Sequence, residues 1–146
     1  MTAVSSGFEM QGACPDPAET VLRFFRYLDD RKYDRIPSLF SDDGVWHRRG
    51  VATSGQDQIR RSIVDIPPVM PTVHLVTNLQ VDRVSPHEAR VVFYVLVLRS
   101  SPDASASAPP WPMQLPLMLT LYKVDLATVA GEWRITVMRN DPIFQQ

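Results

Sequence analysis

The sequence predicts an α+β fold, and two observations about where helical and extended patterns fall carry the prediction. Before residue 67, apolar residues recur at three- and four-residue spacing, which is typical of amphipathic helices. After Pro71, four long segments are rich in branched and aromatic residues and are separated by turn signals. Because consecutive strands joined by turns pair antiparallel, we expect helices packed on one face of a four-stranded antiparallel sheet.

The first helix is predicted to begin at Asp16. Asp16 can cap the helix, Pro17 suits its first turn, and Glu19 completes a capping-box pattern. Phe25 belongs to the apolar face that follows, and Asp29, four residues later, falls on the same face. A carboxylate on an apolar face is costly without a partner, so Asp29 is a candidate functional residue.

Shorter elements are expected between this helix and the sheet. Local capping residues, turn residues and apolar spacing indicate their bounds. They are a short helix capped by Asp34, a turn over residues 41–44, a brief strand over 45–49, and a third helix that starts after Gly55 and stops at Pro67.

The four long strands are predicted over residues 73–84, 89–99, 114–124 and 132–140, with a Pro/Ser/Ala-rich loop over 100–112. Residues 91–98 are apolar or aromatic on both alternating faces, so both faces of the sheet need cover. The helices can cover only one face. We therefore expect a homodimer packed through the outer face of the sheet, unless the sheet curves enough to bury both faces itself. The residues expected in that interface, or their alternates, are Leu115, Leu117, Leu119 and Leu121.

Composition limits the classes of partner. A chain of 146 residues with 45% hydrophobic residues fits one domain, expected over residues 16–146 after a lead-in over 1–15. The net charge of -1 gives no reason to expect nucleic acid or an anionic membrane, and the pairs Arg48-Arg49 and Arg60-Arg61 are interpreted as solvated edges. No apolar run is long enough to span a bilayer. One cysteine excludes an internal disulfide, and with no visible signal peptide we expect a cytoplasmic protein.

His74 is the second candidate functional residue, because it lies in the predicted strand that follows Pro71. An imidazole and a carboxylate buried in one pocket form a proton-transfer pair, with His74 as base and Asp29 as its orienter. The alternatives are a helix-end cap for Asp29 and a satisfied core histidine for His74. The three histidines lack the close spacing of a metal site, and no phosphate loop or nucleophile motif is present, so neither metal nor cofactor is expected.

The order of elements and three segments resemble the SnoaL-like group of the nuclear transport factor 2-like superfamily, near scytalone dehydratase and hexachlorocyclohexane dehydrochlorinase. The segments are LDDRKYDRI at residues 28–36, LFSDDGVW at 39–46 and TVHLVTN at 72–78. The resemblance implies a cone-shaped curved sheet wrapped around three N-terminal helices, with a central pocket. It also implies that Asp29 and His74 match the catalytic pair of those lyases, and that Trp46 matches a tryptophan lining the pocket.

The sequence departs from these relatives at one position and leaves others open. Phe24 stands where the dehydrochlorinase has a lysine, so assistance to a chloride leaving group is absent. Phe25 and Tyr94 are candidates for substrate binding. Arg139 is a candidate for holding developing negative charge, with a surface salt bridge as the alternative.

The expected function is that of a small cofactor-independent lyase or isomerase, similar to a dehydratase, that abstracts a proton from a hydrophobic cyclic or polyketide-like molecule. Two alternatives stay open, because the fold supports many activities. One is a polyketide cyclase of the SnoaL type. The other is a non-catalytic ligand-binding or assembly subunit, such as the small subunit of a ring-hydroxylating dioxygenase.

Overall fold

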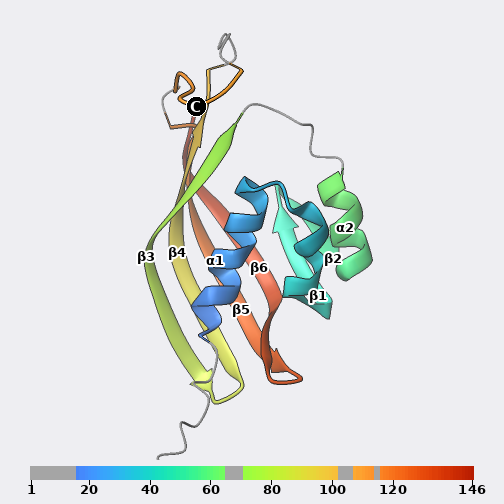
Figure 1. Cartoon of the computed structure of the whole chain (residues 1–146). Helices are drawn as coiled ribbons and strands as arrows, with labels where there is room; N and C mark the ends of the chain where they lie inside the picture. Colours follow the sequence, from blue (N-terminus) through green and yellow to red (C-terminus); the bar gives the residue numbers. More distant parts are fainter. Residues whose placement is uncertain (1–15, 65–70, 102–106, 114–115) are drawn as a thin grey trace, which may run out of the picture.

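The computed structural model describes residues 16–64, 71–101, 107–113 and 116–146. It confirms the α+β class, with helices on one side of a curved sheet (Figure 1). The sheet order is β2-β1-β6-β5-β4-β3. The elements are α1 (Pro17–Asp29), the 3-10 turns η1 (Tyr33–Arg35) and η2 (Pro37–Leu39), β1 (Phe40–Arg48), β2 (Val51–Ser54), α2 (Gln56–Val64), β3 (Thr72–Ser85), β4 (Glu88–Arg99), β5 (Met118–Val129) and β6 (Glu132–Gln145).

The expected antiparallel sheet is present as β3-β4-β5-β6, whose neighbours all pair antiparallel. The sheet continues past β6, because β1 pairs with β6 in parallel and β2 pairs with β1 as a hairpin. As predicted, the Asp16 side chain caps α1 by accepting from the backbone N–H of Ala18 at 3.0 Å. The Pro67 stop signal and Leu115 lie outside the described residues.

The expected turn over residues 41–44 is wrong, because these residues lie inside β1. The turn-forming residues instead build an irregularity, where the register against β6 shifts between Phe40 and Val45. Gly44 is required there, since a Cβ atom would lie 2.8 Å from the carbonyl oxygen of Ile135. The expected second helix is shorter than predicted: it consists of η1 and η2, and η1 has no side-chain cap. The short strand β2 was not expected.

The inner face of the sheet is the face that carries His74, Phe93, Tyr122 and Trp46. Helix α1 packs against β3, β4 and β6 on this side. The rings of Phe24 and Trp46 meet edge-on with centroids 5.3 Å apart, and both side chains are buried. Full burial of one such side chain stabilises the fold by about 1.5–3 kcal/mol. The core therefore fixes α1, and with it Asp29, against the sheet.

Two irregularities decide which residues reach the inner face. In β3 the register shifts between Thr77 and Gln80, where Asn78 adopts a positive φ of 52°. In β6, Ile135 pairs with Leu126 while Val137 pairs with Asp125, so Thr136 is an extra residue. Because side chains alternate along a strand, one extra residue exchanges the faces of all that follow.

The outer face is the opposite side of the sheet, and apolar residues remain exposed on it. Val73 is 48% exposed and Leu75 is 46% exposed. The register places Leu119 and Leu121 on this same face, opposite Leu96 and Tyr94. The sheet therefore does not bury both of its faces within the described chain. Among the described residues, no helix has the length and apolar character needed to cross a membrane.

Candidate active site on the inner face

Asp29 and His74 lie in direct contact, as the sequence predicted. Asp29 is the last residue of α1, and His74 is the third residue of β3. The carboxylate oxygen Oδ1 lies 2.6 Å from Nδ1 of the imidazole. The backbone N–H of His74 also donates to the same carboxylate, at 3.1 Å and 3.3 Å. Residues 45 positions apart are thus joined by two different donors, which fixes both the position and the rotation of the ring.

This arrangement leaves one ring nitrogen of His74 available. An ionised carboxylate only accepts hydrogen bonds, so Nδ1 of His74 must carry the proton and donate it to Asp29. In the part of the chain that the structure describes, Nε2 has no hydrogen-bond partner. The side chains of His74 and Asp29 are 20% and 17% exposed, so neither is sealed in the core. Nε2 is therefore an oriented acceptor.

Aromatic rings continue the inner face from His74. Phe25, one turn before Asp29 on α1, lies 5.6 Å from the imidazole and 5.2 Å from the ring of Tyr122, centroid to centroid. Phe93 stacks on Tyr122 with an interplanar angle of 9° and centroids 5.4 Å apart. Phe25 itself is 2% exposed. It therefore connects the Asp29–His74 pair with Tyr122 as a wall of the site rather than as an open ligand contact.

Tyr122 is a polar group that the sequence analysis did not single out. Burial raises its pKa to about 12, against smaller opposing effects from Arg48 and from a hydrogen bond with Asn140. The phenol therefore stays protonated at neutral pH and can donate a hydrogen bond. Thr120, two residues earlier on the same face, has a buried hydroxyl without a partner among the described residues. Such an atom needs a water or a ligand atom to avoid an unfavourable desolvation free energy.

Arg48 is the second group that was missed, because the sequence analysis placed it on a solvated edge. It shares the face of Trp46, two residues earlier on β1, and its guanidinium lies 5.3 Å from that ring. It donates to the backbone carbonyl of Ser62 in the last turn of α2, at 3.3 Å. Burial lowers the pKa of Arg48, and the neighbouring Arg49 lowers it further. Arg48 lies two residues after Trp46 and therefore on the same face of the strand. This spacing was the sequence signal that could have identified it.

Trp46, Tyr94 and Arg139 lie in the core or on the outer face. Trp46 is 4% exposed and packs among Phe24 and Phe40, so it supports Arg48 from the core. Tyr94 pairs with Leu121 on the outer face, because its neighbour Phe93 occupies the inner one. Arg139 is also on the outer face, where it forms an ion pair with Asp125 at 3.7 Å. The extra residue in β6 turns Arg139 to the outer face. Both Tyr94 and Arg139 lie away from the Asp29–His74 pair.

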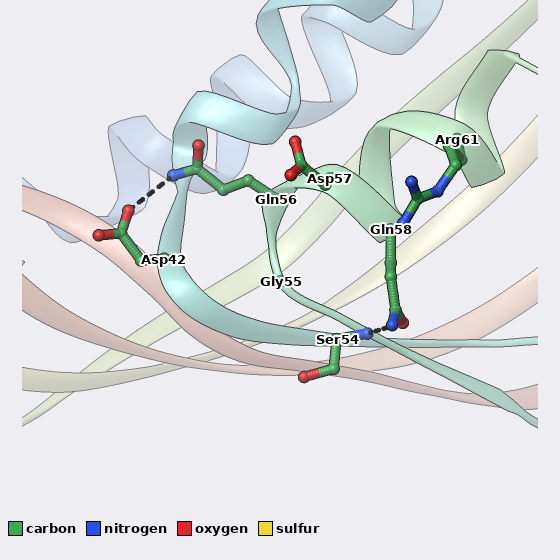
Figure 2. Close-up of a pocket in the computed structure, with 7 residues that line it drawn as sticks. All are labelled: Asp42, Ser54, Gly55, Gln56, Asp57, Gln58 and Arg61. Carbon is green, nitrogen blue, oxygen red and sulfur yellow. Dashed lines mark hydrogen bonds between the residues drawn. The ribbon is translucent and has the colours of Figure 1, made fainter.

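Two cavities of the structure lie elsewhere. Figure 2 shows the larger, about 460 Å³, where the start of α2 meets β2. Its polar groups bond to one another: Gln56 donates to Asp42 at 3.4 Å, and Gln58 accepts from the backbone N–H of Ser54 at 3.2 Å. A second hollow of about 290 Å³ includes Leu96 and Phe144. Neither includes Asp29 or His74, so a central pocket beside that pair stays an expectation.

Comparisons with known proteins agree with the fold. A putative scytalone dehydratase from Novosphingobium aromaticivorans DSM 12444 is 18% identical, with a TM-score of 0.71 over 88% of this chain and 83% of its own. A hexachlorocyclohexane dehydrochlorinase, LinA-type3 from Novosphingobium barchaimii LL02, is 16% identical, with a TM-score of 0.71 over 88% and 85%. A Catenulispora acidiphila protein in complex with S-DNPA is 20% identical, with a TM-score of 0.70 over 86% and 89%.

At these identities, the structural likeness concerns the fold alone. No curated protein matches the sequence. The family model described as a SnoaL-like domain, however, matches residues 18–139, which is most of the chain. The resemblance inferred from the sequence is therefore confirmed, and the chain belongs to the SnoaL-like family.

Proposed function

We propose that this protein is a cofactor-independent lyase or isomerase in which His74 removes a proton from a substrate carbon. The observation that carries the proposal is the 2.6 Å contact between Nδ1 of His74 and Oδ1 of Asp29, with Nε2 left available. The structural relatives include a putative dehydratase and a dehydrochlorinase. Both names denote eliminations, which begin or end with loss of a proton from carbon.

The chemistry follows from the geometry of the pair. Nε2 accepts the substrate proton, which makes the ring an imidazolium, and the Asp29 carboxylate stabilises that positive charge through Nδ1–H. The second contact, from the backbone N–H of His74 to Asp29, keeps the carboxylate in place. A positioned acid-base group of this kind accelerates a reaction by roughly 10² to 10⁴-fold. A donor to the developing oxyanion would supply a further part.

The proposed substrate is a hydrophobic cyclic molecule. Aromatic rings from two elements lie beside His74, because Phe25 on α1 contacts the imidazole and Phe93 on β4 packs edge-on against Phe25. A relative with the same fold was solved with a small molecule bound, S-DNPA, which supports small-molecule binding. Phe24, 0% exposed, occupies the position of the dehydrochlorinase lysine, so we do not expect a chloride leaving group.

Exchange of substrate protons with heavy water tests the proposal. Bicyclic ketones such as 1-tetralone and 2-tetralone are incubated with the protein in D₂O, and deuterium at the carbon beside the carbonyl is followed by NMR. We expect exchange that depends on the protein and that His74→Ala and Asp29→Asn strongly reduce. Equal exchange with the wild type and with both variants, or no exchange beyond the blank for any ketone, would contradict a proton-abstracting role.

We further propose that the protein forms a homodimer through the outer face of its sheet. Val73 and Leu75 are about half exposed there, and Leu119 lies on the same face. Contiguous exposed apolar surface is typical of interfaces between subunits. Sedimentation equilibrium should show a dimer that Leu119→Lys dissociates. Val64→Lys, at the exposed end of α2, is the control and should leave the dimer intact. A monomeric wild type would rule the dimer out.

A further inference from the structure

Arg48 is a cation without an acidic partner. In the described ranges, its contacts are the Trp46 ring at 5.3 Å and the Ser62 carbonyl at 3.3 Å, and it forms no ion pair. A guanidinium has five N–H donors, and the one hydrogen bond leaves most of them unused. A half-buried cation with unused donors is unfavourable unless something binds it.

Two other arginines of the described chain have acidic partners, unlike Arg48. Arg23 pairs with Glu19 at 3.5 Å on the exposed surface of α1. Arg90 pairs with Asp125 at 2.7 Å on the outer face. These cations lie in water and have a carboxylate beside them, whereas Arg48 lies on the inner face and has none among the described residues.

The groups facing Arg48 do not neutralise it. They are the phenols of Tyr122 and Tyr33, both close enough to interact electrostatically. The pKa of Tyr122, about 12, keeps that phenol uncharged at neutral pH. A neutral donor beside an unpaired cation is a favourable environment for an anionic oxygen, because both groups offer N–H or O–H bonds to it.

Arg48 and His74 lie on the same inner face and are linked by packed rings. Phe25 contacts both the imidazole of His74 and the ring of Tyr122, and Tyr122 interacts with Arg48. The strands that carry Arg48 and His74 are separated by four strand spacings, about 19 Å along the sheet. The sheet is curved (Figure 1), so the direct distance is shorter. A molecule that contacts both residues therefore has to be extended.

We propose that Arg48 and Tyr122 form an anion-binding subsite for the carboxylate of an acidic aromatic substrate, on the inner face and apart from His74. The inference rests on the proposed function and names its substrate class: an aromatic acid whose reactive carbon reaches His74 when its carboxylate lies on Arg48. A guanidinium binds a carboxylate through two parallel hydrogen bonds, and stacking on Trp46 holds the guanidinium plane in one orientation.

Binding of a matched acid and amide tests the subsite. The probes are 2-naphthoate and its neutral counterpart 2-naphthamide, and affinities are measured by isothermal titration calorimetry at low ionic strength. We expect the wild-type protein to bind the acid at least tenfold more tightly than the amide. Arg48→Met should abolish that preference. Arg139→Met, which removes an exposed outer-face arginine, is the control and should keep it.

The contradicting outcomes are distinct. Equal affinity of the wild type for both probes, no detectable binding of the acid, or a preference that survives Arg48→Met would each overturn the subsite. If Arg48→Met does not fold, Arg48→Lys takes its place, because lysine keeps the charge and loses the two-pronged geometry. Its preference for the acid should fall severalfold, and an unchanged preference counts against the proposal.

The same experiment separates the subsite from the proposed function. His74→Ala should lose proton exchange and keep the preference for 2-naphthoate, since His74 does not contact the carboxylate in this arrangement. A preference without any exchange in the wild type would leave the subsite standing and contradict the proposed reaction. Proton exchange without a preference for 2-naphthoate would support the proposed reaction and contradict the subsite.

Discussion

The two faces of the sheet use similar side chains in different ways. On the inner face, Asp29 holds His74 at 2.6 Å, and both side chains are mostly shielded from solvent. On the outer face, Asp125 pairs with Arg90 at 2.7 Å, and the arginine side chain is 56% exposed. Exposed pairs of the second kind contribute about 0–1 kcal/mol to stability, because water screens them. The shielded pair is held by two donors and is placed to do chemistry.

The arginines Arg48 and Arg139 also differ in the face of the sheet on which they lie. From the sequence, Arg48 was interpreted as part of a solvated edge, and Arg139 was a candidate for holding negative charge with a surface salt bridge as the alternative. Arg48 lies on the inner face against Trp46, whereas Arg139 lies outside with Asp125. They lie on different sides of the sheet, and the extra residue in β6 sets the side of Arg139.

The largest effect is expected at His74. His74→Ala should reduce protein-dependent exchange of a bicyclic ketone by roughly 10² to 10⁴-fold, because the base is removed. His87→Ala is the matched control, since His87 is an exposed histidine that contacts Thr128 at 3.0 Å. The rates are measured by NMR in D₂O. Similar losses in the two variants would show that the effect is not specific to the inner face.

Replacing Trp46 should mainly lower the stability of the fold. Trp46→Ala should lower the free energy of unfolding by about 3–5 kcal/mol, because it leaves a cavity beside Phe24 and Phe40. Trp111, 39% exposed, is the matched control, and Trp111→Ala should have a much smaller effect. Urea denaturation measures both values. Equal values would mean that Trp46 is not part of the core.

Tyr122 should make stability depend on alkaline pH. Burial raises its pKa from 10 to about 12, so the unfolded chain loses this proton at lower pH than the folded chain does. Stability is therefore complete below pH 10 and is lost as pH rises toward 12, by about 2–3 kcal/mol in total. Tyr122→Phe should remove this part of the loss, and Tyr94→Phe should not. Parallel pH profiles of Tyr122→Phe and the wild type would refute the assignment.

Arg139 should have the smallest effect. Arg139→Met removes an exposed ion pair with Asp125, and we expect the free energy of unfolding to change by less than about 1 kcal/mol. Proton exchange should be unchanged. A large loss of exchange in Arg139→Met would place the site on the outer face instead.

Much of the fold could be predicted because local patterns agree with it. The cap at Asp16, the Asp29–His74 contact and the four long strands all follow from spacing or from the family resemblance. Residues 41–44 could not be interpreted correctly, because turn-type residues also build a strand irregularity when a partner strand such as β6 is present.

The candidate site was predicted in part. Arg48 and Tyr122 were not singled out, and the outer-face positions of Tyr94 and Arg139 were not predicted, because the face of a residue depends on strand register. Register irregularities, such as the one at Thr136, arise from pairing between strands and leave no clear local signal.

The tautomer of His74 tests the central claim most directly. Long-range ¹H–¹⁵N correlation spectra of the protein labelled with ¹⁵N-histidine, recorded at pH 9 and assigned with His74→Ala, report which ring nitrogen carries the proton. We predict that His74 is protonated at Nδ1 and bare at Nε2, and that Asp29→Asn disturbs this pattern. A proton on Nε2 in the wild-type protein would contradict the account, because the nitrogen facing the substrate could then not act as a base.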